Sequence, residues 1–199
     1  MIEDRLSRFL NRGIVDLNTS ISVSFEINDL KSNLSINSEN DFLVLKFIWD
    51  NYGECSFKNG LFWTINPNEY MDIAKLFHGV SNIAIPIIRT ATGCLFLWDY
   101  FDDEYVITYL DVHYNKYEFY GDTFEDLFNY DLISDAVWND QLNGERERLA
   151  LSTTLSLNRD ECVVPVPAIV VGGEFTRDNL KKEKIIEHLF LLAQLHLKM

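Results

Sequence analysis

The sequence predicts an α+β fold, with an antiparallel sheet of about five to seven strands and helices in the N-terminal part, the middle and the C-terminal part. Apolar residues recur at helical spacing near both ends of the chain, and apolar and polar residues alternate in short runs between them. The turns between these runs are too short to hold crossover helices, so the strands should pair antiparallel.

The N-terminal part should hold two helices. Residues 2–10 have one apolar stripe, and residues 18–37 are rich in Ser, Asn and Thr. The second stretch should be a loop with one strand near 21–27. Ser38 should begin a second helix that ends before Gly53, since Asp41 three residues on completes a capping-box variant.

Two short motifs predict structure directly after that helix. Asn59-Gly60 joins two apolar runs and favours a tight hairpin, because both residues tolerate a positive φ. Asn66-Pro67 combines a good N-cap residue with a proline suited to the first helical turn. A hairpin followed by a helix is therefore expected between residues 54 and 79.

A meander of strands should follow, at 82–89, 94–101, 104–112 and 117–120. Thr123 should cap a short helix after it. Near the end we expect one more strand over 163–171 and a final helix capped by Thr176 or Asp178. We expect one domain over residues 1–199, with residues 1–53 as a candidate helical subregion.

The chain is strongly acidic, with a net charge of −14 and a pI of about 4.6. Such a protein repels nucleic acids and anionic membranes and attracts basic partners. The charge is concentrated between Asp99 and Asp140, where twelve acidic residues accompany a single basic residue, Lys116. This window alone carries a net charge of −11.

Cysteine usage and the apolar runs predict a cytoplasmic protein. The three cysteines are widely spaced and form no CxxC pair, which fits a reducing compartment. The first residues are acidic and polar rather than typical of a signal peptide. No apolar run is long enough to cross a bilayer.

Motifs for catalysis and cofactor binding are missing from the sequence. It contains no Walker, GxGxxG, HExxH or GxSxG motif. Cys162 follows two acidic residues, which would make its thiol a poor nucleophile. Asp99, Asp102, Asp103 and Glu104 lack the ligand spacing of a calcium loop and are more typical of a solvated hairpin tip. We therefore expect no enzyme, no cofactor and no metal.

The acidic window is the candidate partner-binding surface because aromatic residues lie among its acids. Aromatic side chains commonly provide affinity at protein interfaces, while charges steer association. An ordinary solvated face above core aromatics would give the same pattern. The candidate contact residues are Asp99, Tyr100, Asp102, Asp103, Glu104, Glu118, Asp122, Glu125 and Asp126.

Several ordered segments resemble the GAD-like family of bacterial proteins. Residues 59–70 (NGLFWTINPNEY) and 89–99 (RTATGCLFLWD) resemble its hairpin and strand motifs, although Thr92 stands where an aromatic residue is usual. Further matching pieces follow toward the C-terminus: DEC at 160–162, PAIVVGG at 167–173, NLKK at 179–182, EHL at 187–189 and AQLH at 193–196.

Members of this family include immunity proteins that accompany DNase toxins of type VI secretion systems. The resemblance implies a cytoplasmic protein that binds and neutralises a cognate toxin, with no catalytic residues. Two alternatives remain from the residues themselves. One is a metal- or small-ligand-dependent enzyme that uses the carboxylates from Asp99 to Glu104, and the other is a regulatory binding module without a toxin.

Overall fold

The computed structural model describes residues 1–12, 15–23, 36–101, 103–154 and 156–198. A seven-stranded antiparallel sheet runs in simple sequence order from β1 to β7. Its strands are β1 (Val15–Ile21), β2 (Glu54–Phe57), β3 (Phe62–Thr64), β4 (Ile85–Thr90), β5 (Leu95–Phe101), β6 (Glu104–Asp111) and β7 (Lys116–Gly121). The predicted α+β class and strand number are confirmed.

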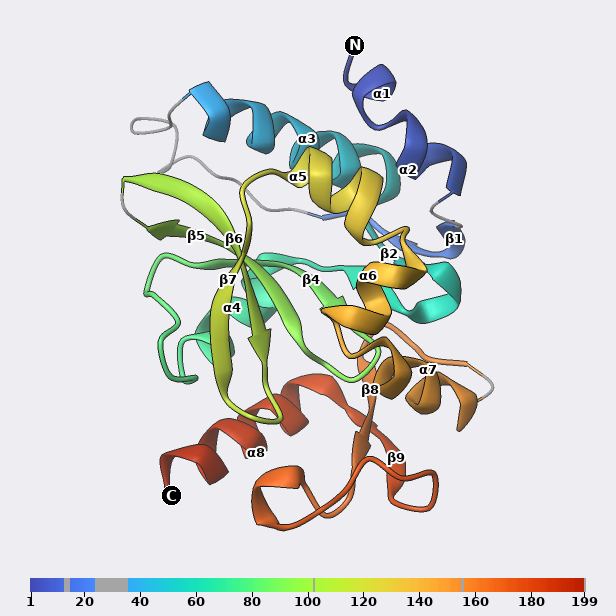
Figure 1. Cartoon of the computed structure of the whole chain (residues 1–199), viewed down its shortest axis with the longest axis vertical. Helices are drawn as coiled ribbons and strands as arrows, with labels where there is room; N and C mark the ends of the chain where they lie inside the picture. The colour runs from blue at the N-terminus through green and yellow to red at the C-terminus, as the bar shows by residue number, and fades with distance from the viewer. Residues whose placement is uncertain (13–14, 24–35, 102, 155, 199) are drawn as a thin grey trace.

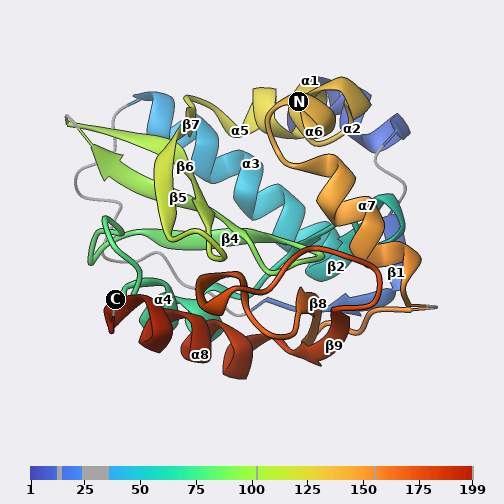
Figure 2. The same cartoon turned by 60° about the horizontal axis from the view of Figure 1, so that its bottom comes forward.

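Helices cover both faces of this sheet (Figures 1 and 2). On one side lie α1 (Ile2–Arg5), α2 (Ser7–Arg12), α3 (Ile36–Tyr52) and α5 (Phe124–Asp126), which continues into a π-helical turn over Leu127–Asp131. On the other side lie α4 (Pro67–Ala74) and α8 (Ile185–Leu197), which pack on each other. Next to the sheet are α6 (Asp135–Asp140) and α7 (Gly144–Ser152).

The turn and the helix starts that short motifs predict are present in the structure as far as α5. The Asn59-Gly60 turn joins β2 to β3 with both residues at positive φ, 59° and 89°. Asn66 caps α4, where its side-chain oxygen accepts a hydrogen bond from Asn68 N at 3.2 Å. The hydroxyl of Thr123 caps α5 in the same way. The helix predicted from Ser38 begins two residues earlier, at Ile36. The strand predicted near 21–27 is wrong where the structure describes it, because β1 lies earlier and ends at Ile21, and residues 24–27 lie outside the described residues.

Two C-terminal predictions are wrong. The strand predicted over 163–171 is β8 (Glu161–Pro165), and a short 3-10 turn (Ile169–Val171) follows it. Residues 180–184, predicted as helix, form β9 (Leu180–Lys184), which pairs with β8 in a separate two-stranded sheet. Helix α8 begins only at Ile185, and its predicted stripe, Ile185, Leu189, Leu192 and Ala193, is buried.

The buried apolar residues form one cluster from Leu6 to Ala193. Phe9 of α2 packs against Phe57 of β2 and Phe128 of the π-helical turn, at ring-centroid distances of 5.1 and 5.0 Å. Trp98 of β5 contacts Phe124 at 5.7 Å, which holds α5 on the sheet. The N-terminal helices therefore share the core of the sheet, and a division at residue 53 stays a prediction.

Candidate partner-binding surface

The β5–β6 hairpin projects at one end of the molecule (Figure 2). Acidic and aromatic residues lie at its end. Phe101 pairs with Glu104 across the turn, and Asp103 adopts a left-handed φ of 67°. The side chains of Asp103 and Glu104 are exposed, and Phe101 and Tyr100 are 66 % and 36 % exposed. We call residues 100, 101, 103 and 104 the acidic tip. Asp102 lies outside the described residues.

Asp99 has a different position from its predicted neighbours. Its side chain is buried and accepts hydrogen bonds from the hydroxyls of Ser81 and Tyr117 and from the backbone N–H of Tyr100. Burial and the hydrogen bond with Asp99 raise the pKa of Tyr117. Asp99 therefore fixes the loop after α4 and strand β7 to β5, and its carboxylate is engaged within the fold.

The other predicted contact residues lie along β7 and α5. Glu118 is exposed and forms an ion pair with Lys116 at 2.7 Å. Phe119 is 60 % exposed and pairs with Thr108, whereas Glu118 pairs with Tyr109, so these neighbours point to opposite faces of β7. Asp122 is exposed in the connection to α5. The structure thus places the described contact residues on β5 and β6 and in the turn between them, on β7, in the connection after it and on α5.

Glu125 and Asp126 line a polar pocket of about 310 Å³ with Arg5, Asn40, Asp41 and Thr123. Arg5 binds Glu125 at 2.7 Å. Asp41 is buried and accepts a hydrogen bond from the backbone N–H of Phe124 at 2.9 Å. Burial raises the pKa of Asp41 to about 6. Asp41 thereby holds the start of α5 on α3.

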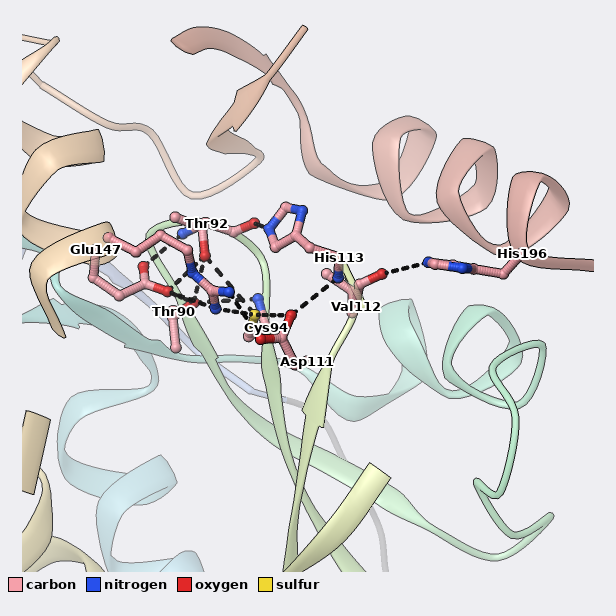
Figure 3. Close-up of polar contacts among 9 residues, drawn as sticks. Thr90, Thr92, Cys94, Asp111, Val112, His113, Glu147 and His196 are labelled. Carbon is pink, nitrogen blue, oxygen red and sulfur yellow. Dashed lines mark hydrogen bonds and ion pairs between the residues drawn. The ribbon is translucent and has the colours of Figure 1, made fainter. Parts of the chain in front are cut away.

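A buried polar network lies where α7 meets the sheet (Figure 3). Arg146 donates to the carboxylate of Asp111 at 2.8 Å and to Cys94 Sγ at 3.0 Å. The neighbouring Glu147, which is fully buried, accepts hydrogen bonds from the hydroxyl and the backbone N–H of Thr92 at 2.5 and 2.9 Å. The same carboxylate accepts one from Thr90 Oγ1 at 2.9 Å. We call these six residues the polar joint: Thr90, Thr92, Cys94, Asp111, Arg146 and Glu147.

Histidines extend the polar joint toward α8. His113 Nε2 lies 3.0 Å from Thr92 O, and His196 Nε2 lies 3.0 Å from Val112 O (Figure 3). Burial and the nearby Arg146 lower the pKa of His113 to about 3, so its ring is neutral at neutral pH.

A cysteine, a histidine and an aspartate thus lie close together, as they do in some active sites. However, Cys94 is fully buried, and burial and Asp111 raise the pKa of its thiol to about 12. A protonated thiol in a closed core is inert as a nucleophile. The polar joint therefore holds the structure together, and Thr92, a departure from the family pattern, supplies two of its hydrogen bonds.

A second set of contacts fixes the chain after α7 to the first hairpin. Buried Arg89 stacks on Trp63, 4.5 Å from the ring centroid, and donates to the carbonyls of Asn158 and Arg159 at 3.1 and 3.0 Å. Arg159 in turn forms ion pairs with Glu54 and Glu69. The C-terminal part is therefore bound to the sheet at two places by buried or half-buried arginines.

Two family models match the chain in succession. Residues 39–109, from α3 into β6, match the GAD-like domain. Residues 122–196, from α5 to α8, match the type VI secretion system immunity protein Tdi1, C-terminal. The chain therefore resembles two known regions in succession, and we call residues 122–196, which match the second model, the Tdi1-type region. The resemblance seen in the sequence is confirmed, and the matches support a role in type VI secretion immunity.

A solved structure has the same fold as this chain. The crystal structure of Atu4351 from Agrobacterium tumefaciens superposes with a TM-score of 0.64 at 18 % identity. The match covers 98 % of this chain and 89 % of that chain. No curated protein matches the sequence.

Two features of the described residues concern membrane insertion and metal binding. None of the helices there is long and apolar enough to cross a lipid bilayer. In that same part of the chain, no group of three His, Cys, Asp or Glu side chains is arranged to hold a metal ion.

The polar joint was not anticipated from the sequence. Its members come from β4, the turn between β4 and β5, β6 and α7, and 57 residues separate Thr90 from its partner Glu147. The sequence carries a weak signal for the burial of Arg146. This residue lies four positions from both Leu142 and Ala150, so a helix that buries these two apolar residues also turns Arg146 toward the core.

Proposed function

We propose that this protein is a cytoplasmic immunity protein that binds one cognate type VI effector and neutralises it, and that the effector is a basic nuclease. The match of residues 122–196 to an immunity-protein model, directly after the GAD-like match, carries this proposal. The nuclease character rests on charge, because surfaces that bind nucleic acid are basic and would be attracted to an acidic protein.

The acidic tip and β7 are the surface that we assign to the first encounter. The tip combines exposed carboxylates with Phe101, and β7 adds Phe119. Charges of one sign at the rim raise the association rate, whereas buried aromatic side chains slow dissociation. This division of roles gives steering to Asp103, Glu104 and Asp122 and affinity to the two phenylalanines.

The direct test is co-expression with the effector encoded beside this gene. An immunity protein should restore growth to cells that produce the effector and should co-purify with it. A purified complex that no longer cleaves DNA would support the nuclease assignment, and an effector with another activity would remove that part alone. Absence of both rescue and complex formation would contradict the proposal.

The enzymatic alternative depends on four carboxylates from Asp99 to Glu104. Asp99 is occupied by three hydrogen bonds within the fold. A regulatory module without a toxin differs from an immunity protein in one measurable respect: it would leave effector toxicity unchanged when co-expressed.

A further inference from the structure

The Tdi1-type region contains an apolar groove that none of the predicted contact residues line. It has a volume of about 520 Å³ and lies between the end of β8, the turn that follows it and helix α8. Its apolar walls and floor come mainly from Pro165, Val166, Pro167, Val171, Leu191 and Leu195. Grooves of this size with apolar walls are typical binding sites.

Helix α8 is apolar on its outer side as well as on its inner side. Leu189 and Leu192 are fully buried against the protein, whereas Phe190 and Leu191 are 48 % and 49 % exposed. The helix lies at the outside of the molecule (Figures 1 and 2). These exposed apolar side chains, with Glu187 and Gln194 beside them, form a surface suited to a partner.

His188 lies in the same groove and is a buried polar group without a partner. Its side chain lines the groove and the residue is only 7 % exposed, yet Nε2 has no hydrogen-bond partner among the described residues. Burial lowers the pKa of His188 to about 4, so the ring is neutral at neutral pH. Because the protein covers Nε2, a ligand cannot reach this atom, and His188 contributes its neutral ring to the floor of the groove.

The rim of the groove carries carboxylates that are free to bind a cation. Glu183 and Glu187 are exposed, and neither forms an ion pair within the described part of the chain. The lysine between them, Lys184, is engaged with Asp160. The rim therefore favours a positively charged group directly beside the apolar floor.

We propose that this groove receives a segment of the cognate effector in which an apolar side chain lies next to a lysine or arginine. The apolar side chain fills the groove over the neutral His188 ring, and the basic side chain binds Glu183 and Glu187. This inference rests on the proposed function and adds a second contact surface to it. A second copy of this chain fits less well, because it would bring the same carboxylates to the rim.

The test compares variants for binding to the effector encoded beside the gene. Leu191→Asp places a charge in the groove, and Leu43→Asp on α3, at 44 % exposure, is its matched control. We expect at least a tenfold loss of affinity for the first and less than a twofold change for the second. Because both side chains are half exposed, both variants should keep the thermal transition of the wild type.

Two further variants test the floor and the rim of the groove. His188→Leu keeps the floor apolar, so we expect effector binding within about twofold of the wild type and an unchanged or higher melting temperature, since an unpaired buried group is lost. Glu183→Lys with Glu187→Lys should weaken binding about tenfold, whereas the exposed Glu145→Lys should not.

The outcomes separate the two proposals. Failure of the wild type to bind the effector overturns both. Binding by the wild type that Leu191→Asp leaves intact overturns the groove alone and keeps the immunity function. Self-association that Leu191→Asp abolishes while effector binding persists would make the groove a contact between copies and would also overturn the inference.

Discussion

The polar joint and the acidic tip are both rich in charge, yet they use it in opposite ways. In the joint, Arg146, Asp111 and Glu147 are buried, paired and held in one geometry. At the tip, Asp103 and Glu104 are exposed beside aromatic side chains. Burial makes the loss of one charge costly, whereas exposure leaves charges free to act on a partner. Composition alone therefore cannot tell structural from functional acids in this chain.

The largest expected effect is loss of the cation in the joint. Arg146→Met should lower the free energy of unfolding by about 3–5 kcal/mol, because Asp111 and Glu147 would stay buried without their partner. Urea denaturation measures this, and exposed Arg148→Met is the control. A loss below about 1 kcal/mol would show that the joint is no more than a surface ion pair.

Asp41 is a buried carboxylate that accepts its hydrogen bond from a backbone N–H, whereas the acids of the joint contact a buried arginine. A folded-state pKa of about 6 lies above the ordinary value of 3.8, so its contribution to stability is full below pH 3.8 and is lost as pH rises through 6. Asp41→Asn keeps an acceptor for Phe124 N–H and removes the titration. We expect it to stabilise the protein by up to about 3 kcal/mol at pH 7.5 and by little at pH 4. Equal effects at both pH values would contradict the assignment.

Charge reversal at the tip should affect association and not folding. Asp103→Lys with Glu104→Lys should slow association with a basic effector about tenfold at low salt and much less at high salt, since screening removes the steering. The free energy of unfolding should change by less than about 0.5 kcal/mol. Stopped-flow association at two salt concentrations provides the measurement. Association that does not respond to salt would remove the steering role.

The smallest effect is expected at Arg5–Glu125, an ion pair with both side chains 36 % exposed. Glu125→Gln should lower the free energy of unfolding by less than about 1 kcal/mol because solvent screens the pair. Thermal unfolding of this variant and of Arg146→Met compares a half-exposed arginine–carboxylate pair with a buried one. A loss as large as that of the joint would mean that burial is not what distinguishes them.

Local sequence signals predicted a turn and two helix starts correctly, as far as α5. Asn59-Gly60, Asn66-Pro67 and Thr123 each dictate a turn or a helix start through their own backbone preferences, and all three act as expected. The sequence did not predict strand β9, because its residues, LKKEK, are mostly exposed and include good helix formers. Only pairing with β8 makes them a strand, and such pairing is invisible to local preference.

The candidate surfaces were predicted in part. The exposure of Asp103 and Glu104 at a hairpin tip follows from the turn between two apolar strands. The burial of Asp99, three residues before the Asp102-Asp103 turn signal, depends on Ser81 and Tyr117, which lie 18 residues away in either direction. The groove needs β8, its turn and α8 together, so no single segment indicates it.

The polar joint also bears on how the two proposed contact surfaces would act together. It ties α7, which precedes the β8 and α8 residues of the groove, to the sheet that carries the tip. For an effector large enough to reach both, the second contact is intramolecular, and two individually weak contacts multiply as in a bivalent binder. Loosening the joint would then reduce this avidity without altering a single residue that the effector touches.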